Sequence, residues 1–334
     1  MENLQYSTPE PSLNSLHALV REDLACVNKV IMENLDTGVP LIPQLAHHII
    51  AGGGKRLRPA LTLISAKLCQ YRGGARHIEL AACIELIHTA TLLHDDVVDE
   101  SALRRGNTTA NEIWGNKASV LVGDFLLSRA FQIMVKDGSL TALGILSDAS
   151  AVIAQGEVMQ LTTANNLETT RQQYLDVITA KTATLFAAAC ELGAVVADKQ
   201  EKRELLRQTG VALGIAFQIM DDTLDYAAEQ QTLGKSVGDD FRDGKVTLPV
   251  ILAYSEGTQA EKKFWKRTLE DQQYGEGDME QALGIIHKYD AIKHSIALAE
   301  EYCETARRLI SGFPATPEKS ALLETVDFCV QRAY

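Results

Sequence analysis

Proline placement is the feature of this sequence that most restricts its fold. All eight prolines lie before residue 60 or after residue 248, so a stretch of almost 190 residues contains none. Proline breaks the interior of a helix because it lacks an N–H and clashes with the preceding turn. Segments such as 15–35, 77–100 and 294–313 repeat apolar residues at i, i+3, i+4 and i+7, whereas strand alternation is nearly absent. We therefore expect an all-α fold, a single large bundle of long helices.

The length of the chain and the placement of its helix-breaking residues indicate one domain. The 334 residues suffice for one large or two ordinary domains, but most of the chain reads as one continuous bundle. We expect a single domain over residues 1–334, with a mobile N-terminus over about 1–15. The more charged segment of about 254–334 is expected to pack as peripheral helices.

Composition and charge exclude several classes of protein. The formal net charge of −12 argues against a nucleic-acid binder and makes local basic clusters informative. The N-terminus lacks the pattern of a signal peptide, and no apolar run reaches the roughly 18 residues of a membrane span. We therefore expect a cytoplasmic protein without an integral membrane segment. The six cysteines show no metal-binding spacing and are expected to be buried free thiols.

Two copies of one acidic motif carry the strongest functional signal. DDVVD occupies residues 95–99 and DDTLD residues 221–225, each after a long apolar run. In a helix, residues i and i+4 share a face, so Asp95 and Asp99 repel each other, as do Asp221 and Asp225. A divalent cation removes the repulsion, and Mg²⁺ binds through one or two carboxylates plus substrate phosphates. Two such motifs facing each other would hold a polyphosphate.

A solvated helix face is the alternative for each motif, because acidic i, i+4 pairs are common on surfaces. Here neither motif offers Lys or Arg at i+4 to pair with its aspartates, and both follow apolar segments, 84–94 and 211–220. This context favours the metal site.

Positive charge is concentrated where a diphosphate site requires it. GGGKRLRP places Lys55, Arg56 and Arg58 in a turn that leads into a helix, where side chains and free backbone N–H groups can meet one anion. Arg104 and Arg105 follow the first motif, and guanidinium groups suit phosphate. The alternatives are a basic cap on an exposed turn for the first group and an Asp–Arg surface pair for the second.

Further polar residues interrupt apolar or loop segments. Lys181 and Thr182 interrupt the small, apolar run ITAKTATLFAAA, where an ammonium group is costly without a partner. Gln218 precedes the second motif by three residues, and His88 precedes Asp95 by two helical turns. Lys235 and Lys245 occupy the loop after the second motif. For His88 a core position is the alternative, and for the two loop lysines a solvent-exposed one.

These motifs in this order resemble the all-trans polyprenyl diphosphate synthase family over nearly the whole chain. The matching segments are GGGKRLRP, DDVVDESALRRG, the KT pair, QIMDDTLDY and GDD…DGK…TLP. The long-chain members, octaprenyl, solanesyl and decaprenyl diphosphate synthases, are the most similar in appearance. The resemblance implies the isoprenoid synthase type I fold, with helices around a central cavity, and a homodimer.

The resemblance also implies the roles of the residues. Three Mg²⁺ ions would bridge the motifs to an allylic diphosphate, with Asp95, Asp99 and Asp221 as ligands and Asp96, Asp222 and Asp225 beside them. The allylic diphosphate would be held by Arg104, Lys181, Thr182, Gln218, Lys235 and Lys245. Isopentenyl diphosphate would be held by Lys55, Arg58, His88 and Arg105, with Arg56 assigned less firmly.

The implied reaction is repeated condensation of isopentenyl diphosphate onto an allylic diphosphate such as farnesyl diphosphate. Metals and cationic side chains stabilise the departing diphosphate, so no nucleophilic side chain is needed. The product is a polyprenyl diphosphate of about C40 to C50, by analogy with relatives that make quinone side chains, and it is expected to pass to a membrane enzyme.

Product length is expected to depend on the helix wall below the first motif. The residues four and five before Asp95 are Thr91 and Ala90, where short-chain members tend to carry an aromatic plug. Small residues here leave the path open, and Phe131 or Met134 is a candidate for its floor.

Three alternatives remain. A short-chain farnesyl or geranylgeranyl diphosphate synthase is disfavoured by the small residues at 90 and 91. A terpene cyclase is expected to replace the second DDxxD motif, which is intact here. A non-catalytic regulatory subunit or acidic scaffold is expected to carry degraded motifs.

Overall fold

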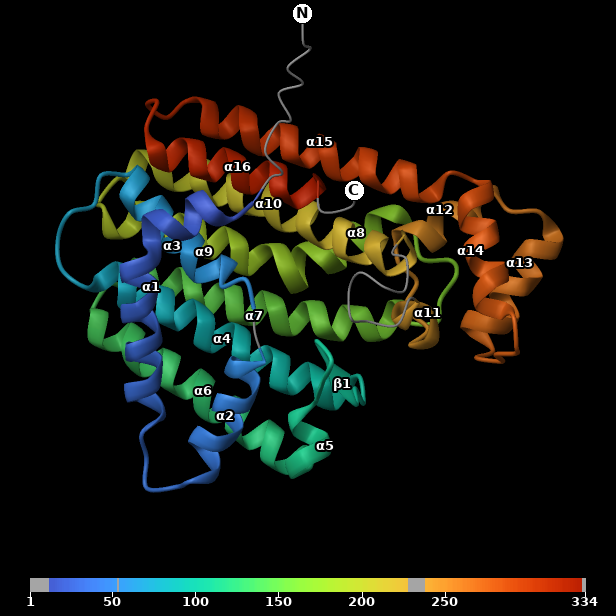
Figure 1. Cartoon of the computed structure of the whole chain (residues 1–334), viewed down its shortest axis with the longest axis horizontal. Helices are drawn as coiled ribbons and strands as arrows, with labels where there is room; N and C mark the ends of the chain where they lie inside the picture. Colours follow the sequence, from blue (N-terminus) through green and yellow to red (C-terminus); the bar gives the residue numbers. More distant parts are fainter. Residues whose placement is uncertain (1–11, 53, 228–237, 332–334) are drawn as a thin grey trace, which may run out of the picture.

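Long helices make up nearly all of the regular structure in the computed structural model, which describes residues 12–52, 54–227 and 238–331 (Figure 1). The helices of the first half are α1 (Asn14–Leu35), α2 (Leu41–Ala51), α3 (Leu57–Leu68), α4 (Arg76–Val98), α5 (Ala110–Trp114), α6 (Asn116–Asp137) and α7 (Leu140–Thr163). Those of the second half are α8 (Arg171–Ile178), α9 (Thr184–Val196), α10 (Gln200–Ala227), α11 (Asp239–Arg242), α12 (Leu248–Glu256), α13 (Gln259–Trp265), α14 (Asp278–Lys288), α15 (Ala291–Ser311) and α16 (Pro317–Gln331), with π-helical turns η1 (Thr179–Ala183) and η2 (Lys266–Glu270). The prediction of an all-α fold is confirmed.

A short hairpin is the only sheet in the described part of the chain. β1 (Leu103–Arg104) pairs antiparallel with β2 (Asn107–Thr108) across the turn formed by Arg105 and Gly106. Both turn residues have positive φ, as a tight two-residue hairpin requires. The segment RRGN therefore links α4 to α5 as a hairpin that carries two arginines.

One continuous hydrophobic core runs from Leu13 to Val330. The central helices are α4, α9 and α10, and every residue of α9 from 185 to 196 is buried. α10 packs against α9 and α15, while α4 packs against α6. Helices from both ends of the chain, α1 and α16 among them, contribute buried residues to this core.

Two glycines fix the π-helical turn η1 against its neighbours. A Cβ at Gly156 of α7 would lie 2.8 Å from the backbone nitrogen of Lys181, and one at Gly214 of α10 would lie 2.6 Å from the Cα of Ala183. A side chain cannot be accommodated at either distance without moving backbone. π-Helical turns inside helices are frequent at functional sites, and η1 carries Lys181 and Thr182.

The C-terminal segment is only partly peripheral. α13 and α14 project from one end of the bundle, whereas α15 and α16 lie along α10 (Figure 1). Buried residues of α15, such as Leu298 and Ala306, place this helix in the core. The expectation of a mobile N-terminus falls mainly on residues 1–11, which lie outside the described residues.

Glu261 anchors the projecting helices. It closes the capping box of α13 with Thr258 and accepts hydrogen bonds from Lys288 at 2.7 Å and Tyr289 at 2.8 Å. The hydrogen bonds from Lys288 and Thr258 lower the pKa of Glu261 to about 2. A lowered pKa in the folded state stabilises the fold at neutral pH, and this contribution is lost as the pH falls from about 4.5 towards 2.

We expect Glu261→Gln to lower the melting temperature at pH 7 by on the order of 2 °C. The difference from the parent should shrink at pH 3, because most of the stabilisation that comes from the lowered pKa of Glu261 has been lost once the unfolded chain binds a proton there. Thermal unfolding followed by circular dichroism at both pH values checks this, with the exposed Glu256→Gln as the matched control. An equal difference at both pH values would contradict the role of the Glu261 charge.

Candidate active site

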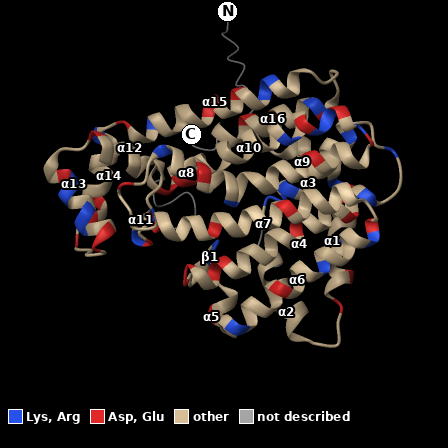
Figure 2. Ribbon diagram, turned by 180° about the vertical axis from the view of Figure 1, so that it is seen from behind, with Lys and Arg blue, Asp and Glu red and all other residues tan. Residues whose placement is uncertain are grey.

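A cavity of about 780 Å³ lies between the ends of α4 and α10, and the hairpin, α7, α8, η1 and α11 complete its walls. Its volume lies within the range of small-molecule sites. In Figure 2, acidic segments lie beside β1 and beside α8, the region of the two acidic motifs. The predicted site residues that line the cavity are Lys55, Arg56, Arg58, His88, Thr91, Asp95, Asp99, Arg104, Arg105, Lys181, Thr182, Gln218, Asp221, Asp222, Asp225 and Lys245.

The first acidic motif lies at the C-terminal end of α4. Asp95 is in the last turn, and Asp99 is the residue that caps the helix, with its N–H still bonded to the Asp95 carbonyl at 2.8 Å. Both carboxylates therefore face the cavity, as the spacing predicts. Burial raises the pKa of Asp95, and the nearby Asp99 raises it further against the opposing effect of Lys181. A cation at this wall would relieve that cost.

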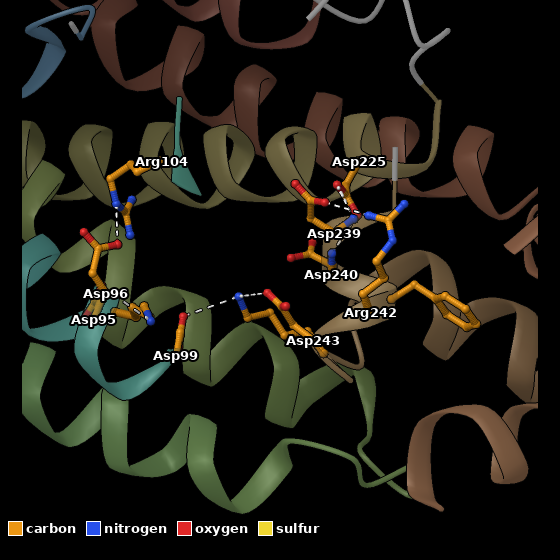
Figure 3. A network of polar contacts seen from close by, with 12 residues as sticks. Asp95, Asp96, Asp99, Arg104, Asp225, Asp239, Asp240, Arg242 and Asp243 are labelled. Atoms are coloured by element: carbon orange, nitrogen blue, oxygen red, sulfur yellow. Dashed lines mark hydrogen bonds and ion pairs between the residues drawn. The ribbon is translucent and has the colours of Figure 1, made fainter. Parts of the chain in front are cut away.

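Asp96 differs from its neighbours in the motif. Its side chain is 1% exposed, does not line the main cavity, and accepts a hydrogen bond from Arg104 Nε at 2.7 Å (Figure 3). Burial raises the pKa of Asp96, and Arg104 opposes the rise. The Asp–Arg pair weighed for Arg104 is thus present. Because Arg104 also lines the cavity, Asp96 holds this guanidinium at the wall.

Lys181 has two acidic partners. Its Nζ lies 2.7 Å from Glu157 Oε2 of α7 and 3.7 Å from Asp95 Oδ2. The expectation that a lysine in this apolar stretch needs a partner is met by the protein's own carboxylates. Burial, and then the Asp95 charge, raise the pKa of Glu157 to about 7. Glu157 has no distinctive spacing from any motif, so sequence reasoning missed it.

The second motif lies at the end of α10, on the opposite side of the cavity. Asp221 is exposed to the cavity, whereas Asp222 is buried and accepts hydrogen bonds from Tyr174 and Gln218. Burial raises the pKa of Asp222 to about 7, although both hydrogen bonds oppose the rise. Asp225 accepts hydrogen bonds from the backbone N–H groups of Asp239 and Asp240 at 3.2 and 3.0 Å. The second motif therefore caps α11.

α11 adds carboxylates that sequence reasoning did not nominate. Asp239 and Asp240 line the cavity beside Asp225, and Asp243, the residue after α11, lines it on the side of Asp99 (Figure 3). Burial raises the pKa of Asp240 well above its usual value, and Asp222 and Asp225 add to the rise. The segment GDD…DGK is part of the pattern that resembles the family. That pattern is the signal from which these carboxylates could have been predicted.

Lys245 joins the two walls. Its Nζ lies 3.4 Å from Asp99 Oδ2 and 3.1 Å from Asp243 Oδ2. Burial by itself would lower the pKa of Lys245, but Asp240, Asp99 and Asp243 raise it above its usual value. Lys235, the other predicted loop lysine, lies outside the described residues.

The basic wall comes from the turn before α3 and from the first turn of that helix. Arg56 pairs with Glu85, and Arg58 Nη1 donates to His88 Nε2 at 3.1 Å. Arg58 also stacks on Phe186, with 4.6 Å from Cζ to the ring centroid. Burial lowers the pKa of Arg58 to about 10, and burial and then Arg58 lower that of His88 well below its usual value. His88 is therefore neutral and accepts at Nε2.

Ala90 corrects one sequence-based expectation. Thr91 lines the cavity, but Ala90 is 2% exposed and is not among the lining residues. Successive helical residues are rotated by about 100°, so a residue four before Asp95 lies about 40° from it and a residue five before lies about 140° away. Only the first of these shares the face of Asp95.

Neither candidate for the tunnel floor lies at the cavity. Phe131 is 36% exposed, and Met134 is completely buried. Neither residue lines the cavity. The proposal that one of them ends the path is therefore wrong for this cavity.

The donor set fits Mg²⁺. In the described part of the chain, no three acidic, histidine or cysteine side chains lie close enough to hold a metal ion by themselves. Mg²⁺ usually binds through one or two carboxylates plus substrate phosphates and water. Hard oxygen donors on two facing walls, with basic groups around them, match that mode of binding. The arrangement can bind a metal-complexed diphosphate and stabilise it as a leaving group.

Comparisons with known proteins agree with this chemistry. Residues 39–286 match the family model of polyprenyl synthetases. The chain is 44% identical over 322 residues to octaprenyl diphosphate synthase of Escherichia coli (strain K12), covering 96% of this chain and 99% of that protein.

Solved structures give the same result. A decaprenyl diphosphate synthase from Rhodobacter capsulatus has a TM-score of 0.93 at 47% identity, covering 97% of this chain and 100% of that one. A polyprenyl synthase from Caulobacter crescentus CB15, complexed with calcium and isoprenyl diphosphate, also has a TM-score of 0.93, at 46% identity, covering 98% and 100%. The chain therefore belongs to the polyprenyl synthetase family and is a prenyltransferase of the long-chain, all-trans type.

Proposed function

We propose that this enzyme adds isopentenyl diphosphate repeatedly to an allylic diphosphate, with farnesyl diphosphate as starter. The product is an all-trans polyprenyl diphosphate of about C40 to C50 for a quinone side chain, by analogy with the octaprenyl and decaprenyl relatives. The observation that carries the proposal is one cavity with both DDxxD motifs on facing walls and basic residues around them.

Mg²⁺ is the proposed cofactor, with three ions per site and Asp95, Asp99 and Asp221 as ligands. Bound metal would supply charge stabilisation of the departing diphosphate. Burial raises the pKa of Asp95, which supports a cation at this wall because added positive charge would offset the cost of the buried carboxylate. The calcium and isoprenyl diphosphate in the Caulobacter crescentus structure support the same kind of site.

The two ends of the cavity are proposed to bind different substrates. The allylic diphosphate is assigned to Arg104, Lys181, Thr182, Gln218, Lys235 and Lys245. Isopentenyl diphosphate is assigned to Lys55, Arg56, Arg58, His88 and Arg105. Support comes from the clustering of the described members of both sets around the cavity. Lys181 forms an ion pair with Glu157, and Lys245 forms one with Asp243. Binding of a diphosphate would replace each of these carboxylates with another anionic partner.

The chemistry proposed for these residues is ion-pair stabilisation. The allylic C–O bond breaks, the double bond of isopentenyl diphosphate attacks the carbocation, and a proton leaves, which regenerates an allylic diphosphate five carbons longer. The cationic side chains hold the departing diphosphate as its charge develops. The departing diphosphate is the proposed proton acceptor.

A second copy of the chain is the proposed partner of α6 and α7. In the described residues, fourteen large hydrophobic side chains are exposed, and eight of them lie on these two helices. Leu121 is 68% exposed and Leu140 is 83% exposed. An apolar surface of this kind marks an interface, and the family resemblance supports a homodimer.

Two segments of the described chain, Asn116–Asp137 and Arg171–Val196, are long and apolar enough to cross a membrane by length and composition alone. This differs from the expectation that no such run exists. The second segment is 83% buried within the bundle, as a core helix is, and the first is the apolar helix α6. We retain the cytoplasmic location and transfer of the product to a membrane enzyme as proposals.

We expect Leu121→Asp to convert a dimer into a monomer. A charge at the centre of an apolar interface would be left buried and unpaired. Light scattering after size exclusion gives the mass of each species. Val39→Asp is the control, because Val39 is 53% exposed and precedes α2, outside both α6 and α7. A parent that is monomeric at micromolar concentration would overturn the proposed partner.

The function is tested with purified protein, Mg²⁺, isopentenyl diphosphate and farnesyl diphosphate. The dephosphorylated products are then sized. Products of about C40 to C50 are expected from the small residue Thr91 at the cavity wall. Products that stop at C15 or C20 would assign a short-chain synthase instead. No elongation, beside an active octaprenyl synthase control, would overturn the proposed reaction.

A further inference from the structure

Tyr174 of α8 is a cavity residue that belongs to none of the motifs. Its side chain is 5% exposed, and its hydroxyl donates a hydrogen bond to Asp222 Oδ2 at 2.6 Å. A buried phenol needs a hydrogen-bond partner, and a carboxylate is a strong one. The partner here is the second aspartate of the DDTLD motif.

This hydrogen bond is the first of a chain that crosses three elements. The other oxygen of Asp222, Oδ1, accepts from Gln218 Nε2 at 2.7 Å. Gln218 Oε1 in turn accepts from the Thr182 hydroxyl at 2.9 Å. The chain therefore runs from Tyr174 of α8 through α10 to Thr182 of η1.

The direction of each hydrogen bond fixes the groups at the cavity wall. Both oxygens of Asp222 have protein donors, so this carboxylate is engaged within the wall. Because the nitrogen of Gln218 bonds to Asp222 and its oxygen to Thr182, its amide has one orientation. Its second N–H remains as a donor. Buried chains of this kind strengthen one another and hold side chains rigidly.

We propose that Tyr174 is a positioning residue, which holds Asp222 so that Gln218 and Thr182 keep one arrangement at the cavity wall. The inference rests on the proposed function, in which Gln218 and Thr182 hold the allylic diphosphate. Tyr174 acts through these residues and need not touch the reacting atoms. Its loss should therefore affect turnover more than the binding of isopentenyl diphosphate, which is assigned to other residues.

Tyr174→Phe tests the role by removing one oxygen atom. We expect kcat for the first condensation to fall about tenfold, the size of one lost hydrogen bond to a charged group. The KM for isopentenyl diphosphate should change by less than about twofold, because its proposed ligands are untouched. Melting temperature is measured in parallel.

Tyr289→Phe is the matched control. Tyr289 also donates a hydrogen bond to a carboxylate, Glu261, at 2.8 Å, but it lies on the projecting helices. We expect this variant to lose stability without losing kcat. If Tyr174→Phe lowers the melting temperature like the control and leaves kcat unchanged, Tyr174 is a structural residue and the inference is overturned.

A double-mutant cycle with Gln218→Ala separates the inference from the function on which it rests. When Tyr174→Phe is added to Gln218→Ala, kcat should fall by less than about twofold relative to Gln218→Ala alone, because the residue through which Tyr174 acts is already gone. A full additional loss would overturn the positioning role. If Gln218→Ala itself retains parental kcat and KM for the allylic diphosphate, the proposed role of Gln218 is wrong, and the inference fails with it.

Discussion

Asp95→Asn is expected to lower kcat/KM for chain elongation by at least about 100-fold, the scale of losing a principal charge-stabilising group. Asparagine keeps the shape of the side chain but removes the charge that would bind Mg²⁺. The Asp95 carboxylate lies 3.7 Å from the Lys181 ammonium, and burial raises the pKa of Asp95. The fold therefore tolerates an uncharged side chain at this position, and the expected loss of activity comes from weaker metal binding.

Binding measurements distinguish this from a folding defect. Mg²⁺ together with inorganic diphosphate should raise the melting temperature of the parent and leave that of Asp95→Asn nearly unchanged. Without ligands the variant should melt at or above the parent temperature. The control is Asp176→Asn, an exposed carboxylate of α8 outside the cavity, for which parental activity is expected. Parental Mg²⁺ dependence in Asp95→Asn would remove the first motif from the metal site.

The part of the site that sequence could predict depends on local spacing. Asp95 and Asp99 share a helical face whatever the rest of the fold does, because an i, i+4 relation is set by helix geometry alone. The order of the motifs then identified the family and hence the basic residues around them. The same geometry separates Thr91 from Ala90, which differ by one residue and about 100° around the helix.

The remainder of the site depends on tertiary packing. Glu157 meets Lys181 because α7 lies against η1, where a glycine permits close approach. Tyr174 meets Asp222 across 48 positions of sequence. No periodicity in either segment indicates these pairs. Asp96 shows the converse. Its position in the DDxxD motif suggests a cavity residue, but the hairpin places Arg104 against its carboxylate, and the side chain is buried away from the cavity.

Thr91→Tyr is expected to shorten the product to about C15 to C20, because an aromatic ring would occupy the side of the cavity along which the chain grows. Thr91 is half-buried and lines the cavity. Its hydroxyl donates a hydrogen bond to the carbonyl of His88, and its small side chain leaves space in the cavity. The first condensation should continue, because the substitution leaves every proposed metal and diphosphate ligand in place.

Product sizing by liquid chromatography and mass spectrometry decides whether position 91 or position 90 limits chain growth. Ala90→Tyr places the same ring in a fully buried position and should cost about 1–3 kcal/mol of stability through overpacking; the ring shortens the product only if repacking brings it to the cavity. Thr305→Tyr is the control for the substitution itself, because Thr305 is a half-buried threonine of α15 outside the cavity with the same kind of bond to its own helix. If Ala90→Tyr shortens the product and Thr91→Tyr does not, the polyprenyl chain grows along the other face of α4. Its path then extends beyond the cavity that Thr91 lines.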